Sequence, residues 1–584
     1  MIKTLAKSVR EYKIYAILAP ISVALEVIVE CLIPLVTVKF ISILNAVPEG
    51  QKPDMNLILK FGFILLGMAM LSLIFGAFAG RMAAIASCGF AKNLRHDLYY
   101  SIQNFSFSNI DKFSTAGLVT RLTTDVANVQ MSFMMIIRTA VRCPLMLVVA
   151  LAMAIITSPK MSVMFAFIIP ILALGLFLVV KGAMPIFKSV FKKYDKLNES
   201  IQENVGGMRV VKAYVREKYE QKKFEAASEE VKKDFTKAEK ILALNNPLMQ
   251  LCFNLVMLSV SFFGSRLIIT SKGSDLDVGG YSALMTYGAQ ILMSLMFLSV
   301  IIVMISMSFA SAQRLCEVLK EESSIKNPDS PVTEVRDGSI IFDKVSFSYS
   351  ATAEKKALSD ISFFIASGET VGIVGGTGSG KTSLIQLISR LYDVSEGFVK
   401  VGGVDVRDYD IDVLRDQVAV VLQKNVLFSG TIKENLRWGD PNATDADMER
   451  ICRLAQADEF IQNFPDKYDT YIEQGGTNVS GGQKQRLCIA RALLKKPKIL
   501  ILDDSTSAVD THTDALIRRA FAEEIPDTTK IIIAQRISSV EHADKIVVMD
   551  GGSIESIGTH EELLEKSPIY REVYESQVKG GSMK

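Results

Sequence analysis

The sequence predicts a chain of two parts, an α-helical membrane domain with six spans followed by an α/β domain. Of the 584 residues, 49% are hydrophobic, and the mean hydropathy is +0.28, which is too apolar for a wholly soluble protein. Six long apolar stretches lie before residue 312. After them, short β-rich runs alternate with helical segments, a pattern typical of an α/β domain.

The apolar stretches are each long enough to cross a bilayer, which takes about 20 residues. They cover residues 15–43, 56–85, 131–156, 161–180, 242–269 and 281–310. Residues 185–242 contain fourteen Lys or Arg, whereas the candidate outer loops contain only Lys52 and Lys272. This asymmetry and the even number of spans predict a multi-pass protein with both termini in the cytoplasm. The alternative, six buried core helices, leaves the charge asymmetry unexplained.

Two segments are free of proline, residues 54–143 and 186–246. Helices of about fifty residues would be about 75 Å long, roughly twice the thickness of the bilayer. We therefore expect spans two to five to project into the cytoplasm, where they can reach the second domain. The predicted organisation is a membrane domain at 1–317, a charged, proline-containing linker at 318–338, an α/β domain at 339–578 and a tail at 579–584.

Other features narrow the class of protein. The seven cysteines show no CxxC spacing, which predicts neither a disulfide framework nor a metal site. The first apolar stretch is too long for a secretory signal, and the segment before it is too short for an organellar transit peptide. We therefore expect the plasma membrane of a bacterium. The net charge of +2 says little by itself, and we expect no nucleic-acid partner.

A phosphate-binding loop follows the strand predicted at 371–374 and precedes a helical pattern. The loop and the start of the helix are Gly375, Gly376, Thr377, Gly378, Ser379, Gly380, Lys381, Thr382 and Ser383. Glycines let backbone N–H groups turn toward a β-phosphate, Lys381 adds positive charge, and Thr382 offers its hydroxyl to Mg²⁺. The strand–loop–helix context separates this motif from a chance glycine-rich turn. The sequence therefore predicts a P-loop nucleotide-binding domain with ATP and Mg²⁺ as cofactors.

Two further residues are expected beside the phosphates. Asp503 closes the apolar strand that begins at Ile499, and a carboxylate at this place is a natural direct or indirect ligand of Mg²⁺. Gln423 follows another apolar strand, residues 418–422. We expect its amide at the edge of the γ-phosphate, within reach of the metal.

The run Val479, Ser480, Gly481, Gly482 and Gln483 resembles the signature sequence of ATP-binding cassette (ABC) proteins, which pair it with the loop and strand above. The resemblance covers nearly the whole chain and is to an exporter half-transporter, a six-helix membrane domain fused to a P-loop NTPase cassette. It implies that Tyr349 stacks on adenine and that Gln423 links the nucleotide to the membrane domain. It also implies a loop at 507–510 that communicates between two nucleotide sites, and coupling regions at 111–125 and 203–217.

In that family two cassettes form a head-to-tail dimer, and each ATP lies between the phosphate loop of one chain and the signature of the other. The resemblance therefore implies that Ser480, the Gly481 and Gly482 backbone, and Gln483 reach the nucleotide bound by a partner. Val479 replaces the usual leucine, and this change leaves the contact intact.

Two positions depart from the family pattern. Asp504 stands where the family has a glutamate that polarises the attacking water, and its carboxylate is set back by about 1.5 Å. Gln535 stands where the family has a histidine that contacts the γ-phosphate, and a neutral amide replaces it only in part. The displacement of the Asp504 carboxylate by about 1.5 Å can lower the rate of ATP hydrolysis about a hundredfold. We expect Asp504, Gln535 and Gln423 to form a weakly hydrolytic site, unless Asp504 still acts through a longer contact with water.

This pattern resembles the degenerate-site subunit of a heterodimeric multidrug exporter. The resemblance implies a transport ATPase whose partner is a different half-transporter with the glutamate and histidine intact. The expected substrates are lipophilic or cationic drugs. The alternatives are a lipid, peptide or metal-chelate transporter of the same fold, an ATP-gated regulatory membrane protein, or a homodimer with two slow sites.

Two carboxylates lie within the first apolar stretch. Glu26 and Glu30 are four residues apart and share one face of a helix, where charged groups in a bilayer are costly. One interpretation is a site for cationic substrates. The other is an internal ion pair, because Arg138 and Arg142 are also four apart in the third span. The depths of Glu30 and Arg142 match within about 3 Å at 1.5 Å per residue.

Other residues are candidates for lining a substrate path. Met293 and Met296 belong to a methionine stripe in the sixth span, and methionine suits a surface that accepts many shapes. Gln250 and Asn254 lie in the fifth span. Each set has a structural alternative, ordinary helix packing for the methionines and hydrogen bonds between helices for the amides.

Overall fold

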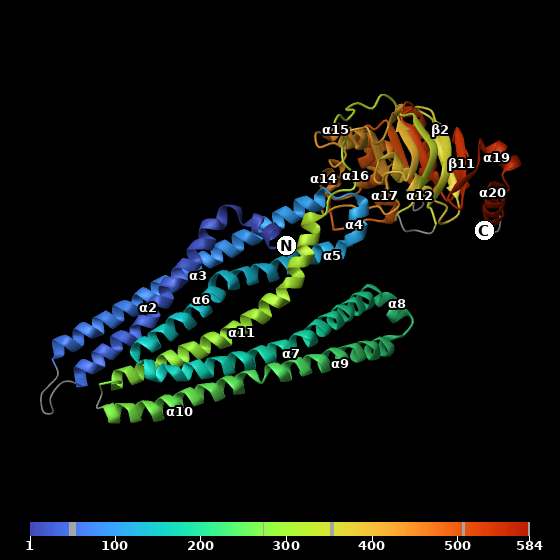
Figure 1. The fold of residues 1–584 in the computed structure, drawn as a ribbon. Coiled ribbons are helices and arrows are strands. Elements are labelled where there is room, and N and C mark those ends of the chain that lie inside the picture. Colours follow the sequence, from blue (N-terminus) through green and yellow to red (C-terminus); the bar gives the residue numbers. More distant parts are fainter. Residues whose placement is uncertain (46–53, 272–273, 351–354, 505–508, 582–584) are drawn as a thin grey trace. The chain divides into compact units, whose positions relative to one another are not determined.

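The computed structural model describes residues 1–45, 54–271, 274–350, 355–504 and 509–581. The chain divides into two compact units (Figure 1). One comprises Met1–Asn104 and Phe113–Glu321, and the other comprises Phe105–Lys112 and Glu322–Lys584. Lys52 and Lys272, which enter the predicted charge asymmetry, lie outside the described residues.

The first unit is helical, and six of its described segments are long and apolar enough to cross a membrane. They are Ile2–Asn45, Met55–Gln103, Thr115–Thr157, Pro159–Gly206, Glu217–Ser271 and Val278–Lys320. Each predicted apolar stretch falls within one of these segments. The predicted six-span membrane domain is therefore confirmed.

These segments differ in how continuous their helices are. Their helices are α1 (Ile2–Ala6), α2 (Lys13–Asn45), α3 (Met55–Gln103), α5 (Thr115–Thr120), α6 (Val126–Thr157), α7 (Pro159–Gly206), α8 (Met208–Ala213), α9 (Glu217–Leu242), α10 (Asn245–Ser271) and α11 (Val278–Lys320). Helix α3 runs unbroken for 49 residues, about 74 Å at 1.5 Å per residue, as the absence of proline predicts. The fifth span breaks between α9 and α10, beside Pro247, which has no N–H to continue the helical ladder.

Apolar side chains fill the centre of the helical unit. Phe165 of α7 and Tyr287 of α11 are fully buried. The Tyr287 hydroxyl donates a hydrogen bond to the backbone oxygen of Cys31 in α2 at 2.9 Å, so the polar atom of this buried ring has a partner. Helices α7 and α9 pack side by side and are joined through the short α8 (Figure 1).

The described residues of the second unit form three sheets together with short helices. The sheet orders are β12-β11-β3-β10-β9-β6, β2-β1-β4-β5 and β7-β8. The strands are β1 (Ile340–Phe347), β2 (Leu358–Ile365), β3 (Thr370–Gly375), β4 (Glu396–Val401), β5 (Val404–Asp405), β6 (Val418–Val421), β7 (Gly430–Thr431), β8 (Tyr471–Ile472), β9 (Ile499–Asp503), β10 (Thr529–Ile533), β11 (Lys545–Asp550) and β12 (Ser553–Gly558). The helices are α4 (Phe107–Phe113), most of which belongs to this unit, α12 (Lys381–Ile388), α13 (Ile411–Gln417), α14 (Ile432–Leu436), α15 (Asp445–Leu454), α16 (Asp458–Gln462), α17 (Gly481–Leu494), α18 (Thr511–Glu524), α19 (His560–Lys566) and α20 (Pro568–Gly581). The predicted α/β domain is confirmed.

The six-stranded sheet is largely parallel. Strands β3, β6, β9, β10 and β11 pair in parallel, and β9 and β10 are buried along their whole length. Runs of Ile, Leu and Val suit this position because both faces of a parallel sheet are covered. The register places Ile533 opposite both Asp503 and Ile373. The carboxyl ends of these strands therefore meet at one edge, where ligands of open α/β sheets bind.

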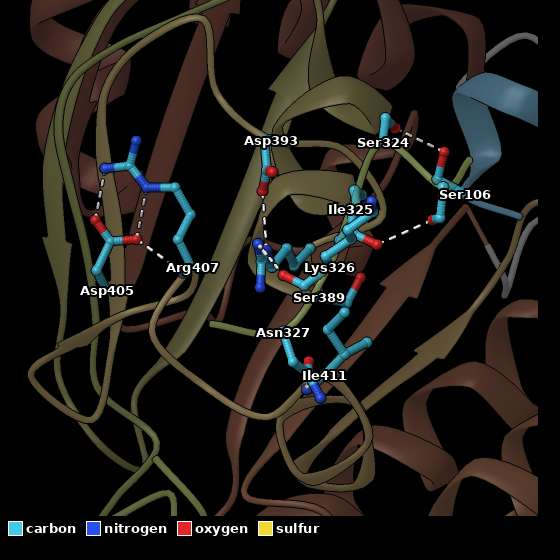
Figure 2. Close-up of polar contacts among 12 residues, drawn as sticks. Ser106, Ser324, Ile325, Lys326, Asn327, Ser389, Asp393, Asp405, Arg407 and Ile411 are labelled. Atoms are coloured by element: carbon cyan, nitrogen blue, oxygen red, sulfur yellow. Dashed lines mark hydrogen bonds and ion pairs between the residues drawn. The ribbon is translucent and has the colours of Figure 1, made fainter. Parts of the chain in front are cut away.

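Residues 105–112 form a short segment that packs on the α/β unit. Asn109, at its centre, is 5% exposed. Its side chain accepts a hydrogen bond from the Ser106 backbone N–H at 3.1 Å and donates one to the Glu322 backbone oxygen at 3.2 Å. The hydroxyls of Ser106 and Ser324 lie 2.8 Å apart (Figure 2). The segment is thus tied to the chain that leads into β1.

The predicted linker, residues 318–338, is not a free tether. Its first residues continue α11 to Lys320. Farther along, the Asn327 side-chain oxygen accepts a hydrogen bond from the Ile411 backbone N–H at 3.0 Å (Figure 2), and Arg390 donates one to the Lys326 backbone oxygen at 3.2 Å. The predicted tail, 579–584, begins as the last turn of α20, and residues 582–584 lie outside the described part.

Candidate functional site

The predicted nucleotide residues converge at the carboxyl edge of the six-stranded sheet. Gly375 ends β3 and Asp503 ends β9. Gln423 comes two residues after β6, and Gln535 comes two residues after β10. These four residues therefore lie at the edge of the sheet where ligands of open α/β folds bind.

The phosphate loop curves around the ammonium group of Lys381. Its Nζ donates hydrogen bonds to the backbone oxygens of Gly375 at 2.8 Å and Gly376 at 2.7 Å, and to the Ser379 hydroxyl at 3.3 Å. Gly378 and Gly380 have φ values of +81° and +95°, a backbone conformation that glycine adopts without strain. A side chain at 380 would also lie 2.8 Å from the Ala357 backbone oxygen. Burial lowers the pKa of Lys381, and the neighbouring Asp503 and Asp504 oppose that shift.

The donor set beside the loop suits Mg²⁺. The Thr382 hydroxyl donates to an Asp503 carboxylate oxygen at 3.1 Å. Burial raises the pKa of Asp503, against the effect of the Thr382 hydrogen bond and of Lys381. Within the described part of the chain, no group of three or more His, Cys, Asp or Glu could hold a metal by itself. Mg²⁺ commonly uses one or two protein ligands together with nucleotide phosphates, and Thr382, Asp503 and Gln423 provide such a set.

The two positions that depart from the family pattern contact each other. The Gln535 amide nitrogen donates to an Asp504 carboxylate oxygen at 3.0 Å, and the Gln423 amide nitrogen lies 3.5 Å from the same oxygen. Asp504 has a φ of +48°, an uncommon left-handed conformation for a residue other than glycine. Its backbone N–H is fixed by a hydrogen bond to the Ile533 oxygen at 2.9 Å. Ser507 and Ala508 of the predicted communication loop lie outside the described residues.

Tyr349, the expected adenine contact, is half exposed. Its hydroxyl lies 2.8 Å from the Ser383 hydroxyl and donates to Gln386 at 3.1 Å, which orients the ring. The ring packs edge-on against Tyr392, with centroids 5.2 Å apart. The predicted stacking role of Tyr349 stays a prediction.

Tyr392 was not among the predicted site residues. Its hydroxyl donates to the Asp111 carboxylate at 2.6 Å, and burial together with this bond raises the pKa of the phenol. Tyr392 therefore connects Tyr349 to the segment 105–112. The two bonded residues are 281 positions apart, so no local pattern in the sequence predicts the contact.

The signature lies at the start of α17. Ser480 caps this helix, because its hydroxyl accepts a hydrogen bond from the Gln483 backbone N–H at 3.3 Å, and the Gln483 side-chain oxygen accepts one from the Ser480 backbone N–H at 2.9 Å. This reciprocal pair is a capping box, which fixes the first helical turn. Ser480 and Gly481 are exposed and Gly482 is partly exposed. The signature can therefore be reached by a second subunit.

In the membrane unit, the structure brings both predicted carboxylates to one arginine. Arg142 in α6 pairs with Glu26, and also with Glu30 at 2.7 Å. Gly76 of α3 makes room for this cluster, since a Cβ there would lie 2.9 Å from a Glu26 carboxylate oxygen. The predicted ion pair is present and involves Arg142. Arg138 extends instead beside Gly80 of α3.

The remaining candidates for a substrate path are partly accessible. Met293 is 45% exposed, and Met296 is partly buried. The amide nitrogen of Gln250 lies 3.5 Å from the Asn254 side-chain oxygen on the same helix, and both residues are exposed. The predicted alternative of a hydrogen bond between helices does not describe this contact. A role in substrate contact stays a prediction for all four residues.

A membrane domain of six helices and a nucleotide-binding α/β domain on one chain define a half-transporter. Comparison with known families agrees with this class. The family profile for the ABC transporter transmembrane region matches residues 17–295, and the profile for the ABC transporter matches residues 358–507. The chain belongs to the ABC transporter family.

Relatives of similar length support this assignment. The uncharacterized ABC transporter ATP-binding protein YfiB of Bacillus subtilis is 36% identical over 98% of both chains. A second Bacillus subtilis protein, the uncharacterized YknU, is 34% identical over 91% of this chain and 90% of its own. A bacterial Atm1-family ABC exporter with ATP bound has the same fold, with a TM-score of 0.84, 22% identity, and coverage of 97% of this chain and 99% of that one.

Family membership carries general consequences. An ABC cassette is an ATP-binding domain of a transport ATPase, and a half-transporter acts in a bilayer as a dimer with another ABC subunit or with itself. The predicted exporter half-transporter is confirmed at this level.

Proposed function

We propose that the chain is one half of a heterodimeric ATP-driven exporter and holds ATP at a site that hydrolyses it slowly. The observation that carries this proposal is the contact between Gln535 and Asp504. Both of the positions that should activate water and contact the γ-phosphate are altered. Asp504 and Gln535 are hydrogen-bonded to each other. The two departures from the family pattern therefore belong to one altered site.

The backbone around Asp504 keeps its short side chain set back. Its N–H is bonded to the Ile533 oxygen, so the main chain cannot advance without breaking a sheet contact. A glutamate would carry the carboxylate about 1.5 Å farther out. Gln535 and Gln423 direct amide N–H groups at the aspartate, and an amide N–H is a donor that cannot take a proton from water.

The other functional elements of the cassette are present. Lys381 and the loop glycines, with Ser379 and Ser383, would hold the phosphates, and Thr382, Asp503 and Gln423 would hold Mg²⁺. Tyr349 would stack on adenine. The helix cap at Ser480 keeps the signature in a fixed form from which Ser480, Gly481, Gly482 and Gln483 can contact a nucleotide bound by the partner.

Exposed apolar surfaces support a second subunit. In the membrane unit, Val210, Tyr214, Val215 and Tyr219 around α8 are each at least 60% exposed. In the cassette unit, the rings of Phe428 and Trp438 stack with centroids 4.3 Å apart and are 45% and 64% exposed. Exposed apolar patches commonly mark interaction sites. A different chain with an intact glutamate and histidine would provide the fast hydrolytic site that this chain lacks.

We assign lipophilic or cationic drugs as substrates and the bacterial plasma membrane as the location, with both termini in the cytoplasm. The exposed Met293 and the partly exposed Glu30 and Arg142 support a path that accepts apolar and charged groups. The basic segment 185–242 supports the orientation, because basic residues remain on the cytoplasmic side.

The test is ATP hydrolysis by the full chain in lipid nanodiscs, alone and as the complex that copurifies with it. The full chain alone should be slow, and Asp504→Glu should raise its turnover by about tenfold to a hundredfold. Asp504→Asn is the matched control, because it keeps the size of the side chain and removes the charge. Fast hydrolysis by the unaltered chain alone, abolished by Asp504→Asn, would show that the aspartate is a working base and would overturn the proposal.

A further inference from the structure

Helix α20 is firmly anchored on the cassette near its first turns. Tyr570 is fully buried, and its hydroxyl lies 2.7 Å from His560 Nδ1. The Ser567 hydroxyl accepts a hydrogen bond from the Tyr570 N–H at 3.2 Å and donates one to Glu555 at 2.7 Å. Residues farther along the helix are therefore held at a defined place on the cassette surface.

Gln577, seven residues after Tyr570 on this helix, bonds to the chain that leaves β10. Its amide nitrogen donates to the Gln535 backbone oxygen at 2.8 Å, and its side-chain oxygen accepts from the Ile537 N–H at 2.9 Å. One side chain thus fixes backbone groups on both sides of Arg536. A carboxamide suits this task because it carries a donor and an acceptor in one plane.

The two hydrogen bonds of Gln577 are made to residues that follow the end of strand β10. Strand β10 ends at Ile533, and the Ala534 N–H is 3.4 Å from the Ile373 oxygen. The next residue, Gln535, carries the side chain that donates to Asp504 at 3.0 Å. Gln577 is bonded to the backbone of this same residue. The orientation of the Gln535 side chain thus depends on a contact made from the end of the chain.

We infer that Gln577 is a positioning residue for the nucleotide site: it holds the Gln535 backbone so that the Gln535 amide faces Asp504 and the γ-phosphate. This inference rests on the proposed function, in which Gln535 occupies the γ-phosphate position. Gln577 does not touch the nucleotide. Its loss should therefore weaken the recognition of the γ-phosphate and leave the rest of the nucleotide contact unchanged.

The experiment compares Mg-ATP and Mg-ADP binding to the full chain in nanodiscs, by displacement of a fluorescent nucleotide. Gln577→Leu keeps a side chain of similar size and removes both hydrogen bonds. It should weaken Mg-ATP binding about threefold to tenfold, the usual effect of lost hydrogen bonds, with Mg-ADP binding unchanged. Glu572→Ala, an exposed position on the same helix, is the control and should change neither affinity.

Gln535→Ala and the double variant complete the test. If Gln577 acts through Gln535, Gln535→Ala should cause the same loss for Mg-ATP, and the double variant should add little. Equal weakening of Mg-ATP and Mg-ADP by Gln577→Leu, or no effect on either, would overturn the inference. A Gln535→Ala variant that discriminates between Mg-ATP and Mg-ADP as well as the native chain does would instead overturn the assigned role of Gln535.

Hydrogen exchange tests the positioning separately from nucleotide binding. The Ile537 amide should exchange faster in Gln577→Leu than in the native chain or in Glu572→Ala, because its acceptor has been removed. Unchanged exchange of this amide would mean that Gln577 does not hold the loop, whatever the nucleotide affinities are.

Discussion

Asp503 is the residue whose charge state most directly controls the proposed metal site. Burial raises the pKa of its carboxyl above the ordinary value of 3.8, and only the ionised form binds Mg²⁺ well. A raised pKa means that the carboxyl retains its proton to a higher pH than an exposed aspartate. Metal affinity should therefore be complete above the raised pKa and fall as the pH is lowered through it.

We predict that the Mg²⁺ concentration needed for half-maximal ATP binding rises as the pH is lowered through the raised pKa of Asp503. The measurement is nucleotide binding by the full chain at fixed ATP and varied Mg²⁺. The nucleotide phosphates titrate as well, so Asp503→Asn is needed to isolate the protein contribution. A pH dependence of the same steepness in Asp503→Asn would assign the effect to the phosphates alone.

Arg142 is the residue that links the two carboxylates of the first span. Removing it by Arg142→Leu would leave Glu26, which is 8% exposed, without its cation. A broken buried pair costs roughly 3–5 kcal/mol. Arg142 is 33% exposed, so we expect a loss nearer to roughly 2 kcal/mol, seen as a lower thermal unfolding midpoint of the purified chain.

The triple variant Glu26→Gln, Glu30→Gln, Arg142→Leu distinguishes an ion pair from simple packing. It removes all three charges together, so it should recover most of the stability lost in Arg142→Leu. A triple variant as unstable as the single variant would show that the arginine acts through its volume and not through its charge.

At the scale of elements, residues 105–112 belong to the cassette unit although they lie between two helices of the membrane unit in the sequence. Asn109 holds this segment through hydrogen bonds to Ser106 and to the Glu322 backbone. Asn109→Leu removes these bonds and leaves buried polar groups unpaired, at a cost of about 1–3 kcal/mol. We predict faster amide exchange in residues 105–112 and 322–327, with unchanged Mg-ATP affinity.

A matched control for Asn109→Leu is Tyr392→Phe, which removes the hydroxyl bonded to Asp111 and keeps the ring. It should loosen residues 105–112 without loosening residues 322–327, since Tyr392 bonds to Asp111 and packs against Phe107, both in the first of these segments. Exchange unchanged in both segments for Asn109→Leu would contradict the role assigned to this asparagine.

The elements themselves followed from local sequence patterns. Long apolar stretches gave the six spans, and the absence of proline gave the length of α3. Apolar strands ending in Gly375, Asp503 and the residues before Gln423 gave the edge of the sheet. Contacts between distant positions did not follow, because Tyr392 and Asp111 are 281 residues apart and Gln577 and Gln535 are 42 apart. Hydrogen bonds of this kind have no periodicity, and only the folded chain brings their partners together.

At the scale of the whole molecule, the proposed function has one half-transporter contribute to two nucleotide sites. In that proposal the phosphate loop and Asp504 belong to one site, and the signature belongs to the other. In a homodimer, the two sites are identical, so any change to the chain affects both. In a heterodimer, changes to the loop and to the signature of this chain act on different sites. The effects of two single variants therefore distinguish the two kinds of assembly.

We predict that Ser480→Asp slows ATP turnover of the copurified complex far more than Lys381→Ala does. Aspartate caps a helix as well as serine does, so α17 should remain intact, while its negative charge faces the γ-phosphate held by the partner. Loss of one stabilising contact at such a centre can cost about a hundredfold in rate. Lys381→Ala disables only the slow site and should leave most of the turnover.

The measurement is steady-state hydrolysis by complexes that carry one variant in this chain and a native partner, with equal amounts of both chains verified. Unchanged thermal unfolding of Ser480→Asp would show that its cap has survived. Equal loss of turnover in the two variants would indicate a homodimer, or a site at Lys381 that hydrolyses as fast as its counterpart. A large loss confined to Ser480→Asp would place the fast reaction on the phosphate loop of a different chain.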